Sequence, residues 1–119
     1  MQSAALRETV MRHPPHPNDL DRKRIERALE QRKRYRYVTP SVAAVADGYR
    51  ITAPCCSRNI DPEGGIVDVA LILFDADRSL WQLYRKDHDK DAWEHHSIFE
   101  RLPDLLALLN ADEDRQFWQ

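Results

Sequence analysis

The stretch from Gly65 to Lys86 constrains the fold of this chain more than any other part of the sequence. It contains two runs of β-type residues on either side of a polar segment, Asp75–Ser79. The first run is rich in branched and aromatic side chains, which suit a pleated surface better than a helix. These residues are Ile66, Val67, Val69, Ile72 and Phe74. We therefore predict a central β-hairpin with its turn at Asp75–Ser79.

Further strands are predicted on both sides of this hairpin. Tyr35–Thr39 alternates aromatic or branched residues with others, and the proline that follows it would confine a strand to a sheet edge. Asp47–Gly48 is a strong turn signal between the extended residues 41–46 and a short strand at Tyr49–Ala53. Ala92–His96 can add one more strand. This order of segments indicates a meander of antiparallel strands.

Two helices are predicted near the ends of the chain. Asn18 is a good N-cap residue, and Asp21 can reach back to it as in a capping box, so the first helix begins there. The second helix begins near Pro103, because proline suits the first turn. Its leucines cover most of its circumference, which predicts burial against the sheet. We expect Asn110 to end it in the left-handed conformation.

The length of 119 residues fits one domain with one hydrophobic core. Three prolines near Pro17 predict an extended segment, because proline lacks a donor and restricts the residue before it. We therefore predict a flexible N-terminal arm over residues 1–17 and a single α+β domain over residues 18–119. The fold class is an antiparallel meander sheet of four to five strands with an N-terminal and a C-terminal helix packed on it.

The apolar runs and the cysteines indicate in which cellular compartment we expect the protein. The longest apolar run, Val69–Phe74, is far shorter than the roughly 20 residues of a membrane-spanning helix, so no membrane contact is expected. The first residues lack the pattern of a secretory signal, and we expect a cytoplasmic location. Cys55 and Cys56 are adjacent, where a disulfide would be strained. This usage agrees with a reducing compartment.

Basic residues are concentrated in the first half of the chain. Residues 1–65 carry twelve Lys and Arg against eight Asp and Glu, whereas residues 66–119 carry six against twelve. A predicted basic helix over Arg22–Arg36 has eight basic residues against two acids, with tyrosines beside it. Such side chains can contact phosphates and stack on bases. The candidate nucleic-acid contacts are Arg24, Arg27, Lys33, Tyr35 and Tyr37.

A solvated helix face is the simpler interpretation of these basic residues. No base-reading motif is present, and the pI of about 6.2 is lower than expected for a nucleic-acid-binding domain. We therefore keep nucleic-acid binding as an alternative that we do not favour.

Cys55 and Cys56, with His88, His95 and His96, are residue types that bind zinc. Paired zinc-binding cysteines are usually two to four residues apart, and adjacent histidines in a strand point to opposite faces. We expect no metal and no cofactor, and the sequence does not determine whether the two thiols have a redox role.

Asp87, His88, Asp89 and Asp91 are residue types that acid–base catalysis uses. They lie on a charged turn with no catalytic motif beside them. We therefore predict no catalytic residues and place an enzyme third among the candidate functions.

The tryptophans and one tyrosine are the most informative side chains. We expect them to fill the space between the sheet and the C-terminal helix, and Phe117 and Trp118 to be docked there. The alternative is an exposed aromatic patch, because such residues dominate interface energetics. The candidate partner contacts are Trp81, Tyr84, Trp93 and Trp118. The preferred function is a non-enzymatic protein-interaction module, with an unknown protein or a second copy as its partner.

The order of these features resembles a known family. The features are helix residues Arg24–Leu29, strand residues Tyr49–Ile51 and Trp81–Tyr84, then Trp93, a leucine-rich helix, an acidic stretch and Phe117–Trp118. Over roughly residues 19–118 the arrangement resembles the small bacterial proteins grouped as domain of unknown function 3024. That family has no established activity, so the resemblance implies a fold and a bacterial source but no reaction.

Two positions depart from the pattern of that family. Its second strand carries a glutamate before an arginine and a proline, where this chain has Cys56 followed by Ser57 and Arg58. Its third strand carries Ala-Lys, where this chain has Ala70 and Leu71. If that glutamate and lysine carry a shared activity, this chain lacks both.

Overall fold

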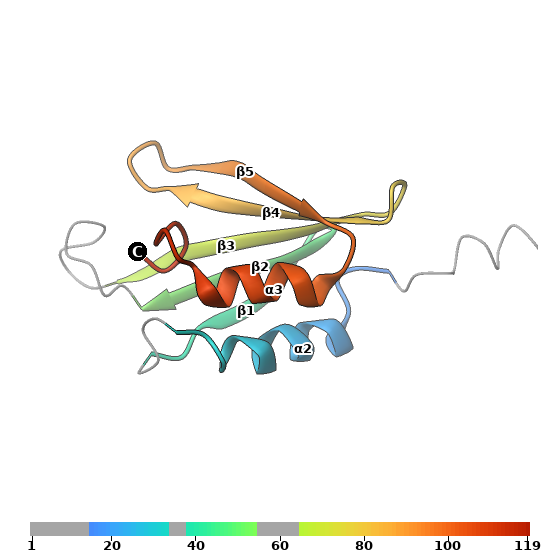
Figure 1. Ribbon diagram of the computed structural model, residues 1–119, viewed down its shortest axis with the longest axis horizontal. Helices are drawn as coiled ribbons and strands as arrows, with labels where there is room; N and C mark the ends of the chain where they lie inside the picture. The colour runs from blue at the N-terminus through green and yellow to red at the C-terminus, as the bar shows by residue number, and fades with distance from the viewer. Residues whose placement is uncertain (1–14, 34–37, 55–64) are drawn as a thin grey trace, which may run out of the picture.

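The computed structural model describes residues 15–33, 38–54 and 65–119. Within these ranges the chain forms two helices and a five-stranded sheet (Figure 1). The elements are α2 (Asp19–Leu29), β1 (Ser41–Val45), β2 (Gly48–Pro54), β3 (Ile66–Asp75), β4 (Leu80–Asp87), β5 (Ala92–Phe99) and α3 (Leu102–Ala111). Each strand pairs antiparallel with its sequence neighbour, in the order β1-β2-β3-β4-β5. The predicted α+β meander is confirmed, with five strands.

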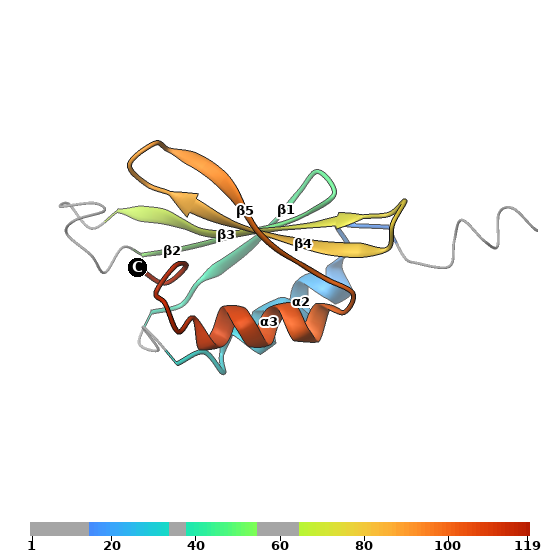
Figure 2. The ribbon, with the colours of Figure 1, turned by 45° about the horizontal axis from the view of Figure 1, so that its top comes forward.

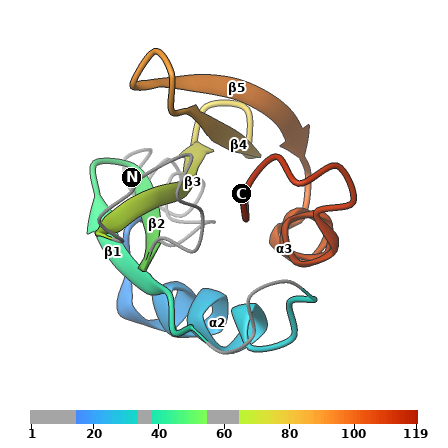
Figure 3. The ribbon, with the colours of Figure 1, turned by 90° about the vertical axis from the view of Figure 1, so that its left-hand side faces the viewer.

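Both helices lie on the same face of the sheet (Figures 2 and 3). Alternate side chains of each strand point toward them and form the core. The largest fully buried side chains are Ile25, Leu29, Tyr49, Ile51, Ile72, Leu83, Leu105 and Leu109. Burying a large apolar side chain stabilises a fold by roughly 1.5–3 kcal/mol, so this layer supplies most of the driving force for folding.

The N-terminus of α2 is as predicted from its cap residues. The Oδ1 atom of Asn18 accepts a hydrogen bond from the backbone N–H of Asp21 at 2.8 Å. The Asp21 carboxylate in turn accepts one from the side-chain amide of Asn18 at 2.9 Å, rather than from its backbone. The cap is therefore reciprocal, but it closes through two side chains.

The prediction of a basic helix extending to Arg36 is wrong, because α2 ends at Leu29. The carbonyl oxygen of Ala28 accepts a hydrogen bond from Nδ2 of Asn110 at 2.8 Å. The carbonyl oxygen of Leu29 accepts one from Nη1 of Arg32, also at 2.8 Å. These two carbonyls also accept the backbone N–H groups of Gln31 and Arg32, so the end of the helix is well satisfied.

The β1–β2 turn lies one residue earlier than predicted. Val45 pairs with Gly48, so Ala46 and Asp47 form the turn, and Asp47 has a φ of 64°. Gly48 instead begins β2 against the backbone of Ile72. A Cβ atom at Gly48 would stand 1.9 Å from the Ile72 carbonyl oxygen, so only glycine permits this approach.

β5 is longer than the predicted strand at Ala92–His96. Its pairing with β4 has a register shift between Leu83 and Tyr84 and continues to Phe99. Of the strand predicted at Tyr35–Thr39, residues 35–37 lie outside the described residues, and residues 38–39 are not in a strand.

α3 begins with Pro103 in its first turn, and its leucine-rich side is buried, as predicted. Its left-handed terminal residue is Asp112, with a φ of 37°, rather than Asn110. Asn110 is still inside α3, and its side-chain amide bonds to α2. Phe117 and Trp118 are each 2% exposed, so the prediction that they dock is confirmed. Neither helix in the described ranges has the length and apolarity to cross a membrane.

The arm predicted over residues 1–17 includes a residue that the structure places in a packed position. The His16 ring lies against Phe74 and Trp81, with centroid distances of 4.8 and 4.6 Å. Its Nδ1 atom is 2.9 Å from the hydroxyl oxygen of Tyr49. The packed part of the chain therefore includes His16, because aromatic residues of three strands surround its ring. Residues 1–14 lie outside the described residues.

Candidate functional site

The four aromatic residues predicted to contact a partner lie on two different faces of the sheet. Trp81 and Trp118 belong to the core under the helices, with 7% and 2% of their surface exposed. Tyr84 and Trp93 project from the opposite face, which neither described helix covers, and both are half-buried. Of the four, Tyr84 and Trp93 are the residues that a partner can touch.

The face that the described helices leave uncovered carries a strip of apolar side chains, and we call it the open sheet face. Leu71 and Leu73 of β3 lie at its centre, and Leu71 pairs directly with Tyr84 of β4. Ile98 of β5, which is 50% exposed, pairs with Gln82 beside Leu73. The apolar strip comprises Val45, Leu71, Leu73, Tyr84 and Ile98. Exposed apolar strips of this kind are typical of interaction surfaces.

One end of the strip opens into a hollow of about 400 Å³. Leu73 and Tyr84 supply apolar surface, and Asp47, Asp75 and Asp77 also line the hollow. The backbone N–H of Phe74 donates to the Asp47 carbonyl at 2.9 Å and holds the β1–β2 turn beside β3. The result is a depression in which apolar side chains and three aspartates lie side by side.

Asp75, the first residue of the turn that carries two of these aspartates, stabilises the turn through its carboxylate. One carboxylate oxygen of Asp75 accepts the backbone N–H groups of Asp77 and Arg78, at 3.1 and 3.2 Å. The guanidinium of Arg78 lies 3.8 Å from the other oxygen and is largely exposed. Two of the three aspartates, Asp47 and Asp77, are therefore left to act on a ligand.

The other end of the open sheet face carries a balanced ion cluster. The ammonium of Lys86 lies 3.1 Å from Asp68 and 3.0 Å from Asp91, and Arg50 donates to Asp68 at 2.6 Å. Burial lowers the pKa of Lys86, but its bonds to Asp91 and Asp68 outweigh this, and the pKa lies above its ordinary value. Lys86 is therefore charged at neutral pH, and this cluster has no net charge to offer a partner.

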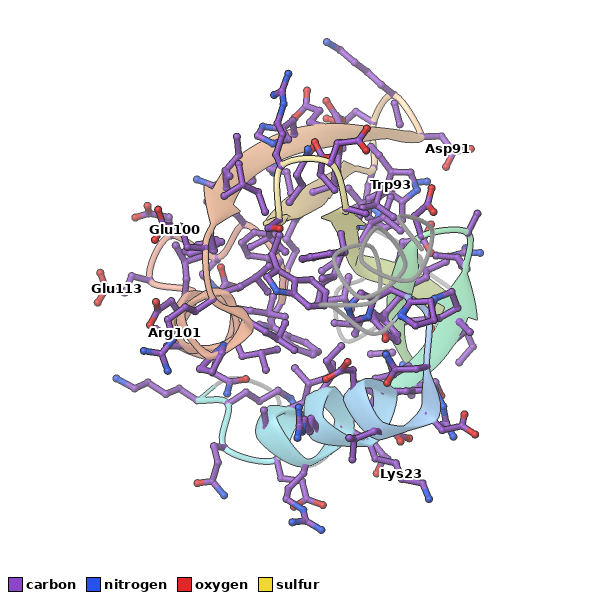
Figure 4. The ribbon with its side chains drawn as sticks, turned by 90° about the vertical axis from the view of Figure 1, so that its right-hand side faces the viewer. Lys23, Asp91, Trp93, Glu100, Arg101 and Glu113 are labelled. Atoms are coloured by element: carbon purple, nitrogen blue, oxygen red, sulfur yellow. The ribbon has the colours of Figure 1, made fainter. Side chains whose placement is uncertain are left out.

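This ion cluster also positions a tryptophan. The Lys86 ammonium lies 5.0 Å from the centroid of the Trp93 ring, within the range of a cation–π contact. Figure 4 shows Asp91 and Trp93 on the β5 side of the molecule, away from Arg101 and Glu113 beside α3. Trp93 thus packs on the sheet face opposite the helices.

The residues predicted to contact nucleic acid are only partly within the described structure. Arg24, Arg27 and Lys33 are exposed, and Lys33 lies beyond the end of α2. Tyr35 and Tyr37 lie outside the described residues. Nucleic-acid binding through these side chains stays a prediction.

Several basic residues of this stretch, including the candidate Arg24, have partners inside the protein. Arg22 pairs with Asp19 and Glu26, and Arg24 pairs with Asp21 at 3.2 Å. Arg32 is 4% exposed and lies over the ring of Trp118, with its guanidinium carbon 4.9 Å from the centroid. Lys23 points from α2 away from the sheet (Figure 4). The surface of α2 therefore alternates in charge.

Among the described residues, no three His, Cys, Asp or Glu side chains are grouped closely enough to hold a metal ion. Cys55 and Cys56 lie outside the described residues. His95 contacts Tyr84 on the open sheet face, whereas His96 contacts Phe117 on the helix side, so their side chains diverge.

Residues 87–91 form the turn between β4 and β5, as predicted. Asp87 accepts the backbone N–H groups of Lys90 and Asp89, and these bonds lower its pKa. Burial and the nearby Lys86 charge lower the pKa of His88. The Asp87 carboxylate therefore shapes the turn, and the turn is charged as predicted.

A family model described as a domain of unknown function, DUF3024, matches residues 13–119. The chain belongs to the DUF3024 family. No curated protein and no solved structure matches it. The DUF3024 assignment confirms the resemblance inferred from the tryptophans, the helix residues and the C-terminal Phe-Trp pair. It does not indicate an activity, because the function of this domain is unknown.

Sequence reasoning about this DUF3024 chain missed several residues of the open sheet face. Leu71 and Leu73 were counted only as strand residues, and Asp47 only as a turn residue. A signal was present in β3, where Val69–Phe74 is apolar at every position, so both faces of that strand are apolar. One of those faces must be covered by something other than the two described helices or remain exposed to solvent.

Proposed function

We propose that this protein is a non-enzymatic interaction module whose open sheet face binds a protein segment with an apolar side chain next to a basic one. The observation that carries the proposal is the hollow that Leu73 and Tyr84 line together with Asp47 and Asp77. The family assignment agrees with this proposal but does not select it.

The chemistry of the hollow selects the partner. A lysine or arginine can lay its aliphatic stem on Leu73 and Tyr84 while its charge meets the aspartates of the hollow. Neighbouring apolar side chains of the partner would cover Leu71 and Ile98, which supplies the hydrophobic part of the affinity. The aspartates would mainly raise the association rate and reject acidic segments.

The experiment uses an array of twelve-residue peptides with a central aliphatic or aromatic residue flanked by lysine or arginine. A matched array carries glutamate at the flanking positions. We expect binders only in the basic array, with Kd values of about 10–100 μM that weaken as salt is added. An array without binders, or equal binding to both arrays, would overturn the proposal.

Two variants locate the binding surface. Asp77→Lys reverses a charge in the hollow, and Asp89→Lys makes the same change at the equivalent position of the β4–β5 turn. Both residues donate their backbone N–H to the first aspartate of their turn, so the two variants carry the same structural risk. We expect Asp77→Lys to weaken peptide binding about tenfold and Asp89→Lys to leave it unchanged. Equal effects would place the binding elsewhere.

A second pair of variants tests the apolar floor. Leu73→Ser removes apolar surface from the hollow, whereas Leu20→Ser removes a leucine that is 62% exposed on α2. We expect only Leu73→Ser to weaken binding. Sedimentation of the protein alone provides a further test, because a dimer that Asp77→Lys disrupts would make a second copy the occupant and overturn the proposal of a foreign partner.

A further inference from the structure

One histidine of the open sheet face lies against a residue that lines the hollow. His95 of β5 is exposed and pairs with Tyr84 of β4, which belongs to the lining. The two rings meet edge to face, with a centroid distance of 5.1 Å and an interplanar angle of 86°. A side chain that a partner lays on Tyr84 would therefore also come close to the His95 ring.

The other histidines that the structure describes do not share this position. His16 packs among aromatic rings of the core, and His96 contacts Phe117 on the helix side. His88 lies in the β4–β5 turn. Histidine is the side chain whose charge changes most readily between pH 5 and 8. A change of charge in this pH range would therefore reach the hollow through His95.

The ionised groups around His95 are mostly paired with each other. Lys86 of β4 is bonded to two aspartates, and Glu94 accepts a hydrogen bond from Arg85. β3 contributes the apolar Leu71, which pairs with the same tyrosine. The hollow adds Asp47, Asp75 and Asp77. A proton gained by His95 would make this face more positive, whether the ring stays in water or meets one of these carboxylates.

We propose that His95 makes partner binding depend on pH, so that the open sheet face holds its basic partner less tightly in mild acid. This inference rests on the proposed function, because it concerns the same surface. A positive charge beside Tyr84 repels the lysine or arginine of the partner. An imidazolium that pairs with an aspartate of the hollow instead weakens the attraction for that residue. Both effects lower the affinity.

The experiment measures the Kd of one peptide from the basic array at about pH 7.5 and about pH 5.5, at constant ionic strength. The peptide contains no histidine and no acid and has blocked ends, so its own charge does not change between these pH values. Fluorescence anisotropy of a labelled peptide provides the readout. We expect the natural chain to bind about threefold more weakly at the lower pH.

Two substitutions at position 95 separate the charge from the rest of the side chain. His95→Gln gains no proton, so we expect one Kd at both pH values. His95→Lys is charged at both pH values, so we expect binding that is about threefold weaker at both. His96→Gln is the matched control, because it removes the neighbouring histidine on the helix side, and it should keep the pH dependence of the natural chain.

Thermal denaturation at both pH values verifies that each variant is folded. Equal binding by the natural chain at the two pH values would overturn this inference and leave the proposed function standing. A His95→Gln variant with the pH dependence of the natural chain would do the same. The absence of peptide binding at both pH values would overturn the proposed function and this inference together.

Discussion

The carboxylate of Asp112 accepts a hydrogen bond from the backbone N–H of Trp118 at 2.7 Å. It also accepts the backbone N–H groups of Gln116 and Phe117, at 2.8 and 3.2 Å. Asp112 is 4% exposed and adopts the left-handed conformation that ends α3. One residue thus ends a helix and holds the last two aromatic side chains in the core.

Replacing Asp112 is expected to loosen the C-terminal segment. Asp112→Ala leaves three backbone N–H groups without their acceptor, and alanine is strained at a φ of 37°. We expect a loss of about 3 kcal/mol in the free energy of unfolding. Urea denaturation measures it, and Asp114→Ala, an exposed aspartate two residues later, is the control with an expected change below about 0.5 kcal/mol. Equal losses in the two variants would contradict the anchoring role of Asp112.

Arg32 is expected to be a structural cation rather than a binding residue. It donates to the carbonyl oxygens of Leu29 and Val38 and lies over Trp118. Arg32→Met keeps the aliphatic length and removes these bonds, and we expect it to cost about 2–3 kcal/mol. Arg27→Met, at an exposed position of α2, should change the stability by less than about 0.5 kcal/mol. An Arg32→Met variant as stable as the natural chain would show that these contacts contribute nothing.

Removing the glycine at position 48 and introducing one at position 47 are expected to affect the stability of the fold differently. Gly48→Ala would bring a Cβ atom to 1.9 Å from the Ile72 carbonyl oxygen, so β2 and β3 must separate, and we expect a loss of about 2 kcal/mol or more. Asp47→Gly relieves a positive φ of 64° and should be neutral or slightly stabilising. Thermal denaturation of the two variants provides the measurement. A Gly48→Ala variant of unchanged melting temperature would rule out the close strand approach.

His88 is expected to make the fold less stable in mild acid. Burial and the neighbouring Lys86 charge lower the pKa of His88 below its ordinary value of 6.5, so the folded state prefers the neutral ring. Its contribution is fully present above about pH 6.5 and is lost as the pH falls toward the lower folded-state pKa, because the unfolded chain then binds more protons. The free energy of unfolding at pH 7.5 and pH 5 is measured for the natural chain and for His88→Gln. We expect the natural chain to lose more stability between these two pH values, and parallel losses would contradict the role of His88.

Local features of the chain were predictable because they depend on residues close in sequence. The cap at Asn18 and the proline in the first turn of α3 both follow from backbone groups within one helical turn. The turns at residues 75–79 and 87–91 share one design, in which the first aspartate accepts two backbone N–H groups and the last residue has a φ above 50°. Only the positions of these turns were predicted.

The candidate surfaces depended on contacts between distant segments. Tyr84 and Trp93 were predicted partner contacts, but the sequence could not separate them from the buried Trp81 and Trp118. That separation depends on which face of the sheet the helices cover. The last turn of α2 likewise bonds to Asn110, which lies 82 residues away from Ala28 in the chain.

By itself, the sequence determined the order of strands and turns, because β-branched runs, caps and turn residues act over a few neighbours. Only the tertiary structure decided which side of the sheet is covered and where α2 stops. The physical reason is that an apolar strand such as β3 can bury either face at similar cost. The choice is made by the helices that pack against it.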